Sequence, residues 1–325
     1  MSHIFEALQR AEEERTGEIS KQPAESVAEL LHAASLLHAA EGKSAESHVE
    51  MPAIAAELPA IAAAVLPNEP RTGDFATTKV LTAAPRENSR LVCMTDPGSL
   101  GAEKFRVLGL RLRHMREKRK LKRIVITSTV PEEGKSLIAT NLALNQARSK
   151  ILKAVLIDGD LRRPTLASLF GFHRNLPGLS ECLRGEFRLA DVLYKIKGTG
   201  LWFLPAGLTP ENPIELMQSG RLKELIEELE TFFDWLIIDT PPVLPLADTP
   251  LWMKISDGVL MVVREAVTEK KSLQRAVELM DPSMTLGLVV NSCSRNELKY
   301  YYSRYGEPAK SEEPDVTGPW VAARK

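Results

Sequence analysis

Lys135 and Ser136 are the residues whose types and spacing point first to chemistry. They end the loop TSTVPEEGKS (127–136), which follows the apolar run RIVITS and precedes the helix-like segment KSLIATNLALNQA. The start of such a helix attracts anions, a lysine there can reach phosphate oxygens, and a serine hydroxyl can bind Mg2+. Thr129 stands where the pattern G-x-x-x-x-G-K-[ST] has its first glycine. The loop predicts a phosphate site, and an ordinary strand-to-helix turn is the alternative.

Three aspartates follow two other apolar runs. AVLIDGD ends in Asp158 and Asp160, and the run WLIID ends in Asp239. The carboxyl ends of parallel strands form the edge at which open α/β folds bind ligands. Any one of these aspartates alone is most simply a turn former or helix cap. Three of them beside a GKS loop predict a site for a nucleotide with Mg2+.

Two adjacent glutamates, Glu132 and Glu133, stand in the loop where a polyphosphate would lie. Backbone N–H groups can still face the phosphates if both glutamate side chains turn to solvent. Residue 132 must then keep a negative φ, because a positive φ is costly for glutamate. We therefore expect both side chains to point outward, and Glu132→Gly to leave nucleotide affinity equal or improved.

Four of the five tyrosines of the chain lie within the six residues YYYSRY. The polar segment GEPAKSEEPD follows, so this stretch is a poor core strand and a poor helix. An exposed edge or an interface is one interpretation, and a tail that is phosphorylated at a neighbouring subunit's nucleotide site is the other. Each phosphate would add about −1.5 to −2 charges at neutral pH. The candidate acceptors are Tyr300, Tyr301, Tyr302 and Tyr305.

The elements that must position these residues alternate between strands and helices. Beyond residue 100, the short apolar runs RIVITS, KAVLID, GLWFLP, WLIIDT, GVLMVV and LGLVVN are separated by helix-sized segments. This pattern predicts a single α/β domain with a mostly parallel sheet and helices on both faces. Helices are expected over 136–148, 213–232 and 269–280.

The N-terminal part has a different composition. In residues 1–17, Ile4, Phe5 and Leu8 share one helical stripe, which predicts a short amphipathic docking helix. Residues 18–99 are rich in Ala, Pro, Glu and Ser, which predicts a disordered linker with a span of roughly 50 Å. An unimportant tail is the alternative. The folded domain is then expected over 100–297 and the tyrosine tail over 298–325.

The charges of the chain nearly cancel, with 42 Lys and Arg residues against 43 Asp and Glu. No overall field therefore favours nucleic acid as a partner. Three widely spaced cysteines fit neither a disulfide framework nor a zinc site, and a reducing cytoplasm is the simplest compartment. The apolar stretch AIAAELPAIAAAVL is interrupted by Glu57 and Pro59 and is shorter than the roughly 20 residues of a membrane span. We expect no membrane span of its own.

Several motifs together resemble those of one protein family. PEEGKS, VLIDGDLRRPTL and LIIDTPPVLPLADT resemble the Walker A, A′ and B motifs of the bacterial tyrosine kinases, which control capsule and exopolysaccharide assembly. LPAGLTPENPIELMQS and the tyrosine group are also similar. The resemblance implies a P-loop NTPase-like fold and a protein-tyrosine autokinase that uses ATP and Mg2+. It also implies a homo-oligomer that a membrane adaptor protein recruits to the inner face of the cell membrane.

The same resemblance implies roles for individual residues. Lys135 and Ser136 would bind the triphosphate and Mg2+, and Asp239 would hold the metal directly or through water. Asp158 and Asp160 would complete the metal site, and one of them would help to remove the proton of the incoming hydroxyl. The remaining nucleotide contacts would come from Glu133, Gly134, Leu137 and Asn291, the last at the adenine.

The sequence departs from the family at Glu132, where relatives often read Pro-Gly-Glu-Gly-Lys-Ser, and at Gly109. The wider relatives, the deviant Walker ATPases, usually carry a signature lysine where this chain has Val130, and this difference favours a kinase over an ATPase switch. Glu103 and Arg106 fit the family's subunit-packing helix, but Gly109 replaces its second arginine. The basic run at 111–123 is interpreted as a solvated helix face. A non-kinase ATPase switch and a nucleotide-binding regulator without kinase activity are the alternatives to a kinase.

Overall fold

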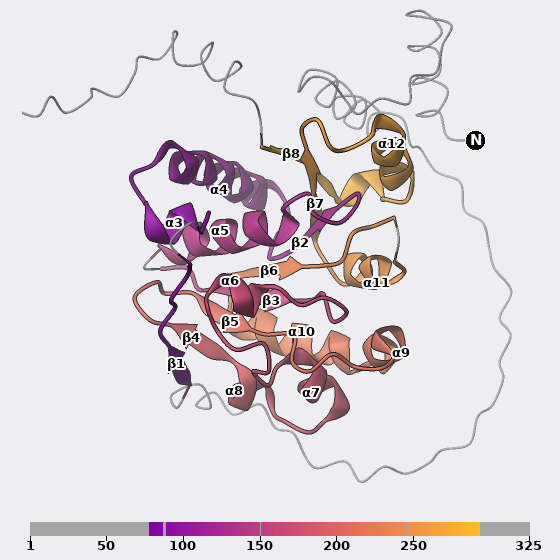
Figure 1. The fold of residues 1–325 in the computed structure, drawn as a ribbon. Helices are drawn as coiled ribbons and strands as arrows, with labels where there is room; N and C mark the ends of the chain where they lie inside the picture. The colour runs from indigo at the N-terminus through magenta and orange to yellow at the C-terminus, as the bar shows by residue number, and fades with distance from the viewer. Residues whose placement is uncertain (1–77, 87–88, 150, 245, 293–325) are drawn as a thin grey trace, which may run out of the picture. The chain divides into compact units, whose positions relative to one another are not determined.

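The computed structural model describes residues 78–86, 89–149, 151–244 and 246–292 (Figure 1). The expected N-terminal helix, most of the expected linker and the tyrosine cluster lie outside the described residues. The phosphate loop and the three aspartates Asp158, Asp160 and Asp239 lie within them.

An eight-stranded sheet forms the centre of the described part, in the order β1-β4-β5-β3-β6-β2-β7-β8. Neighbouring strands are parallel except for the pair β4 and β5. The six predicted apolar runs form β2, β3 and β5 to β8, which confirms the predicted α/β fold. The strands are β1 Lys79–Leu81, β2 Arg123–Ser128, β3 Ala154–Asp158, β4 Tyr194–Ile196, β5 Trp202–Leu204, β6 Trp235–Asp239, β7 Gly258–Arg264 and β8 Thr285–Asn291.

Helices cover both faces of the sheet (Figure 1) because both faces of its central strands are apolar. In β2, Ile124 and Ile126 belong to one core and Val125 to the other. The first core also takes residues from α3 Val92–Thr95, α4 Leu100–Lys118, α5 Lys135–Ala147 and α6 Leu166–Leu169. The second takes residues from α7 Leu179–Arg184, α8 Leu189–Val192, α9 Pro213–Gln218, α10 Arg221–Phe232, α11 Asp248–Lys254 and α12 Lys270–Glu278. A short 3-10 turn, Pro282–Met284, precedes β8.

Two of the three expected helices are found near their predicted bounds, as α5 and α12. The third, expected over 213–232, is two helices, α9 and α10, because Gly220 adopts a left-handed conformation with φ of 84° between them. The start of α9 follows the sequence: the Asn212 side chain accepts a hydrogen bond from the N–H of Glu215, and Pro213 occupies the first turn.

The folded part begins before residue 100, although the linker was predicted to extend to residue 99. β1 pairs with β4, and Leu91 and Cys93 are buried beside α5. The Asn141 side chain of α5 accepts a hydrogen bond from the N–H of Cys93 at 3.0 Å and donates one to the Arg90 carbonyl at 3.0 Å. These bonds attach the segment to the domain, and neither is visible in the composition of the linker.

The basic run at 111–123 is not simply a solvated face, because several of its cations bind the domain. Arg116 lies over the Trp235 ring, 4.9 Å from the ring centroid, and donates to the Asp234 carbonyl at 3.0 Å. Arg123 pairs with Asp257 at 2.6 Å. Gly109 lies in α4 and faces α5. A Cβ on Gly109 would lie 2.3 Å from Asn145 Nδ2.

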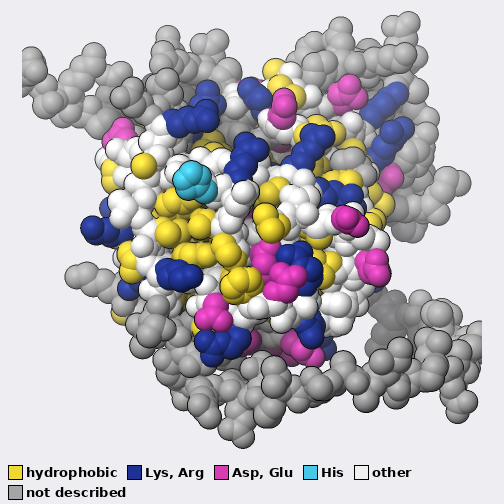
Figure 2. Space-filling model, turned by 60° about the horizontal axis from the view of Figure 1, so that its bottom comes forward, with side chains coloured by type: hydrophobic (Ala, Val, Ile, Leu, Met, Phe, Trp, Pro, Cys, Tyr) yellow, Lys and Arg dark blue, Asp and Glu magenta, His cyan; other side chains and the backbone are white. Residues whose placement is uncertain are grey.

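No helix among the described residues has the length and the apolar character that crossing a membrane requires. Figure 2 shows one face of the molecule, on which Lys and Arg side chains are interspersed with Asp, Glu and hydrophobic side chains.

Candidate active site

The loop between β2 and α5 has the backbone of a phosphate-binding turn. Gly134 precedes α5 with φ of 92°, a left-handed conformation that glycine adopts most cheaply. A Cβ on Gly134 would lie 2.2 Å from Asn291 Nδ2, so a larger residue would also have to displace that side chain. The first N–H groups of α5 follow directly, and Lys135 and Ser136 open the helix as predicted.

Glu133 does not face solvent as expected. Its side chain is fully buried and accepts hydrogen bonds from the Thr129 hydroxyl at 2.6 and 2.7 Å and from the Val130 N–H at 3.1 Å. The Thr268 hydroxyl also donates to it and in turn accepts from the Arg264 N–H at 2.8 Å. Thr129, in place of the first glycine, therefore supplies a hydroxyl that binds a buried carboxylate.

Glu132 is exposed as expected, but its φ is 68°. The backbone at this residue therefore lies in the left-handed region that costs a non-glycine residue free energy. Its carbonyl accepts a hydrogen bond from Arg264 Nη1 at 3.3 Å. The loop is thus tied to the end of β7 through both glutamates.

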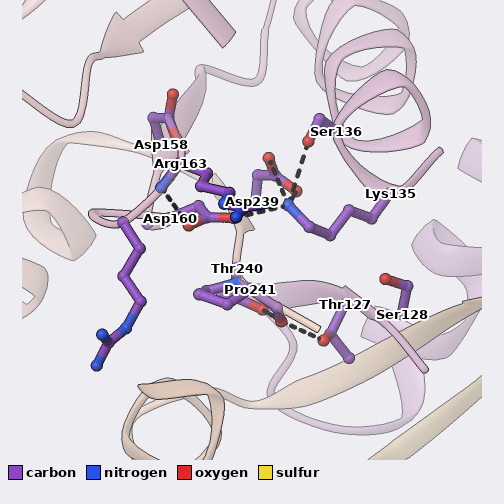
Figure 3. Close-up of polar contacts among 12 residues, drawn as sticks. Thr127, Ser128, Lys135, Ser136, Asp158, Asp160, Arg163, Asp239, Thr240 and Pro241 are labelled. Carbon is purple, nitrogen blue, oxygen red and sulfur yellow. Dashed lines mark hydrogen bonds and ion pairs between the residues drawn. The ribbon is translucent and has the colours of Figure 1, made fainter. Parts of the chain in front are cut away.

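The Lys135 ammonium and the aspartates converge at the carboxyl edge of the sheet (Figure 3). Lys135 Nζ lies 3.2 Å from Asp160 Oδ2, 3.4 Å from Asp239 Oδ1 and 3.3 Å from Ser136 Oγ. Asp158 and Asp239 are paired residues of the adjacent strands β3 and β6. The structure therefore brings together the lysine, serine and three aspartates that the sequence indicated.

Burial and the charges of neighbouring groups together set the pKa values in this cluster. Burial and the nearby Asp239 raise the pKa of Asp158 well above its usual value. Burial also raises the pKa of Asp239, although Lys135 and Ser136 oppose the shift. For Lys135, burial acts to lower the pKa, but the attraction of Asp239, Asp160 and Asp158 outweighs it and the pKa rises. The lysine is held charged while the carboxylates are crowded together.

The donor set fits Mg2+ only in company with a phosphate. Within the described ranges, no group of three or more His, Cys, Asp and Glu side chains is arranged to hold a metal by itself. Mg2+ usually takes one or two carboxylates, with phosphate oxygens and waters as further ligands. Asp158 Oδ1 is buried without a hydrogen-bond partner, while Asp158 Oδ2 accepts from the Leu166 N–H at 3.1 Å. An unsatisfied buried carboxylate oxygen is a suitable cation ligand.

Two other residues that were predicted to contact the nucleotide, Asn291 and Leu137, lie beside or at the start of α5. Asn291 ends β8 and donates from Nδ2 to the Glu133 carbonyl at 2.9 Å, so it touches the loop, and its contact with adenine stays a prediction. Leu137 lies in the first turn of α5 and packs against the core. The four tyrosines fall outside the described residues.

Sequence reasoning missed two residues that hold the site. Thr268 binds Glu133 from beyond β7, and an isolated threonine in a loop carries no signal of such a role. Asp248 is buried in α11 and binds Arg162 through two bonds of 2.8 and 3.1 Å. Asp248 lies within the motif LIIDTPPVLPLADT, and this motif was the available signal for it.

Known proteins similar to this chain include named tyrosine kinases. No protein-family model matches the chain. Tyrosine-protein kinase YwqD of Bacillus subtilis is 34% identical over 221 residues, which cover 66% of this chain and 92% of the relative. Tyrosine-protein kinase CpsD of Streptococcus agalactiae is 31% identical over 187 residues, covering 57% and 81%.

Two solved structures have a similar fold. The chimeric protein CapA2B2 matches with a TM-score of 0.60 and 32% identity, covering 65% of this chain and 93% of that one. The kinase domain of the Escherichia coli tyrosine kinase ETK matches with a TM-score of 0.58 and 27% identity, covering 65% and 84%. These relatives favour the kinase hypothesis over the ATPase switch and confirm the predicted family. With its phosphate loop, aspartates and sheet in the arrangement described, the chain belongs to the bacterial tyrosine kinases.

Proposed function

We propose that this protein is an ATP-dependent tyrosine autokinase that phosphorylates its own C-terminal cluster, Tyr300, Tyr301, Tyr302 and Tyr305. The observation that carries the proposal is the contact of Lys135 with Asp160 and Asp239 at the start of α5. A helix N-terminus, a charged lysine and a set of carboxylates are the parts that phosphoryl transfer requires.

In the transfer, the tyrosine oxygen bonds to the γ-phosphorus as the bond to the β-phosphate oxygen breaks, which releases ADP. The phenolic proton passes to a carboxylate, because a phenol with a pKa of about 10 attacks poorly while protonated. Asp158 and Asp160 are the candidates, because both carboxylates lie at the sheet edge beside Lys135.

The chain's own groups supply the remaining positioning. Lys135 would neutralise charge on the β- and γ-phosphates, and the N–H groups at the start of α5 would bind phosphate oxygens. Mg2+, when bound with ATP, would add charge neutralisation across the same phosphates. Ser136, Asp158, Asp160 and Asp239 would hold it, and Asn291 would contact the adenine.

We also propose that the kinase works in exopolysaccharide production, in contact with a membrane adaptor protein, and that it transfers phosphate between copies of itself. Family membership supports these points. Mixing Lys135→Met, which keeps its tyrosines, with a variant in which all four clustered tyrosines are Phe tests the transfer between copies. We expect phosphotyrosine on the Lys135→Met chains. Its absence, with an active wild type, would mean transfer within one chain.

The proposed activity is tested by incubating the purified full chain with Mg-ATP and probing for phosphotyrosine. We expect a signal that is lost in Lys135→Met and in the four-Phe variant, and only the latter should keep ATP hydrolysis. Normal hydrolysis without phosphotyrosine would instead support the ATPase switch. No nucleotide binding at all would support a regulator without kinase activity.

A further inference from the structure

A cavity of about 490 Å3 opens beside the transfer site, on segments that follow β3 and β5. Its size lies within the range of ordinary ligand sites, about 300–1,000 Å3. One wall comes from the residues after Asp160 and the other from the segment after Leu204. The lining residues are Arg162, Arg163, Pro164, Thr165, Arg174, Asn175, Gly207, Leu208 and Thr209.

The lining carries three arginines and no acidic residue. Arg162 is held by the buried Asp248, and Arg174 Nε donates to Ser168 Oγ at 3.0 Å. The guanidinium of Arg163 has no hydrogen-bond or ion-pair partner among the residues that the structure describes. In Figure 3, this side chain points away from the Lys135 cluster. The Arg163 guanidinium therefore offers N–H donors to an anion in the cavity.

The second wall is rigid. The buried Glu181 carboxylate accepts from the Leu208 N–H at 3.0 Å, from the Gly178 N–H at 2.6 Å and from Arg184 at 2.9 Å. Gly207 has φ of 85°, and a Cβ there would lie 2.0 Å from Glu181 Oε2. The shape of the cavity therefore exists before any ligand arrives, which lowers the entropy cost of binding.

Asp160 separates this cavity from the phosphate loop. Asp160 Oδ2 contacts Lys135 Nζ at 3.2 Å, and Asp160 Oδ1 accepts from the Arg163 N–H at 3.0 Å. Asp160 therefore contacts both the phosphate-loop lysine and a residue that lines the cavity. Lys135 and the N-terminus of α5 would bind the nucleotide phosphates, which leaves the cavity arginines for a different anion.

We propose that the cavity binds a phosphorylated tyrosine of the cluster 300–305, so that one phosphate positions the next acceptor at the transfer site. This inference rests on the proposed kinase function. A phosphotyrosine has three acceptor oxygens and about −1.5 to −2 charges at neutral pH, which suit the guanidinium groups that line the cavity. Pro164 and Leu208 offer apolar contact to its ring. Phosphorylation of the cluster would then accelerate after its first phosphate.

A binding experiment without ATP tests this site separately from the kinase activity. The protein is the full chain with the four clustered tyrosines changed to Phe, so that its own tail carries no phosphate. The probes are fluorescent peptides of residues 297–308, one unmodified and one phosphorylated at Tyr302 only. We expect the phosphopeptide to bind at least about tenfold tighter in fluorescence anisotropy, with the difference shrinking as pH falls through about 6.

Single variants locate the binding. Arg163→Ala and Arg174→Ala should each remove most of the preference for the phosphopeptide. Arg188→Ala is the matched control, because Arg188 is an exposed arginine that pairs with Asp191 outside the cavity. Equal affinity for the two peptides, or a preference unchanged in both cavity variants, would overturn the proposal. The proposal would also be overturned if inorganic phosphate displaced the phosphopeptide as effectively as phenyl phosphate does, because the site would then bind any anion.

Discussion

Glu132 and Glu133 are adjacent in the phosphate loop, yet they contribute to it in opposite ways. Glu133 is buried and takes hydrogen bonds from two threonine hydroxyls and a backbone N–H. Glu132 is exposed, and its backbone has a positive φ. One side chain holds the loop in shape, and the other residue adds strain to it.

Glu132→Gly should therefore stabilise the protein by about 1 kcal/mol, because glycine adopts a positive φ without the steric cost of a Cβ. ATP affinity should stay equal or improve. Thermal unfolding and nucleotide titration measure the two effects. Glu132→Ala is the control, since alanine removes the charge but keeps the Cβ, and it should show no gain. A loss of ATP binding in Glu132→Gly would show that the Glu132 side chain itself is functional.

Glu133→Gln should destabilise the loop by about 1–3 kcal/mol, because its amide puts a donor where hydroxyls and an N–H already donate. ATP affinity and phosphotyrosine yield should fall with it. Thr268→Val should also weaken ATP binding. Thr268→Ser keeps the hydroxyl and should bind ATP as the wild type does. If valine and serine behave alike at 268, the hydroxyl does not hold the loop.

At the scale of elements, single side chains fix how strands and helices meet. Asp257, just before β7, accepts from the N–H groups of Lys122 and Arg123 at 2.9 Å each and pairs with the Arg123 guanidinium. It thereby aligns the starts of β2 and β7, the two strands that lead to the phosphate loop and to Thr268. On the side of the sheet that α4 and α5 cover, Gly109 lets α4 approach α5 closely.

Asp257→Asn should cost about 1.5–3 kcal/mol of stability at pH 7. Burial acts to raise the pKa of Asp257, but its bonds to Arg123 and to the two N–H groups outweigh burial and lower it. A lowered pKa gives stability that is complete above the ordinary carboxyl pKa of about 4 and is lost as pH falls through the folded-state value. Urea unfolding from pH 7 to 3 should show the two proteins converging. A difference that does not change with pH would contradict this assignment.

Gly109→Ala should destabilise the protein by about 1 kcal/mol, although the same change at an open helix site usually stabilises. The reason is the contact of its Cβ with Asn145 in α5. Thermal unfolding measures the loss, and adding Asn145→Ala should restore most of it. Leu110→Ala, at a neighbouring position 60% exposed, should change stability by less than about 0.5 kcal/mol. Stabilisation by Gly109→Ala alone would exclude a close α4–α5 contact.

The sequence was enough to predict the elements and residues with a strong local pattern. The six apolar runs became strands, and Lys135, Ser136 and the three aspartates converge because parallel strands end at one edge. The predicted linker boundary and the predicted outward orientation of Glu133 were wrong, because each depends on a distant partner. Asn141 holds the segment around Cys93, and Thr268 holds Glu133. Such contacts join residues far apart in the chain, and no spacing rule covers them.

At the scale of the whole molecule, a shared sheet edge gathers the chemistry of distant segments. The loop after β2, the aspartates after β3 and β6, and Asn291 at the end of β8 meet beside the start of α5. The arginine-lined cavity adjoins the same edge through Asp160. Donor, metal ligands and acceptor site would then occupy one surface, which suits transfer to a tail from another copy.

The central claim, autophosphorylation of the tyrosine cluster, is tested most directly by intact-mass spectrometry of the full chain. The protein is first dephosphorylated, then incubated with Mg-ATP, and the modified residues are mapped by fragmentation. We predict additions of one to four phosphates, all within 300–305, and none in Lys135→Met. An unchanged mass in a wild-type protein that binds ATP would contradict the account.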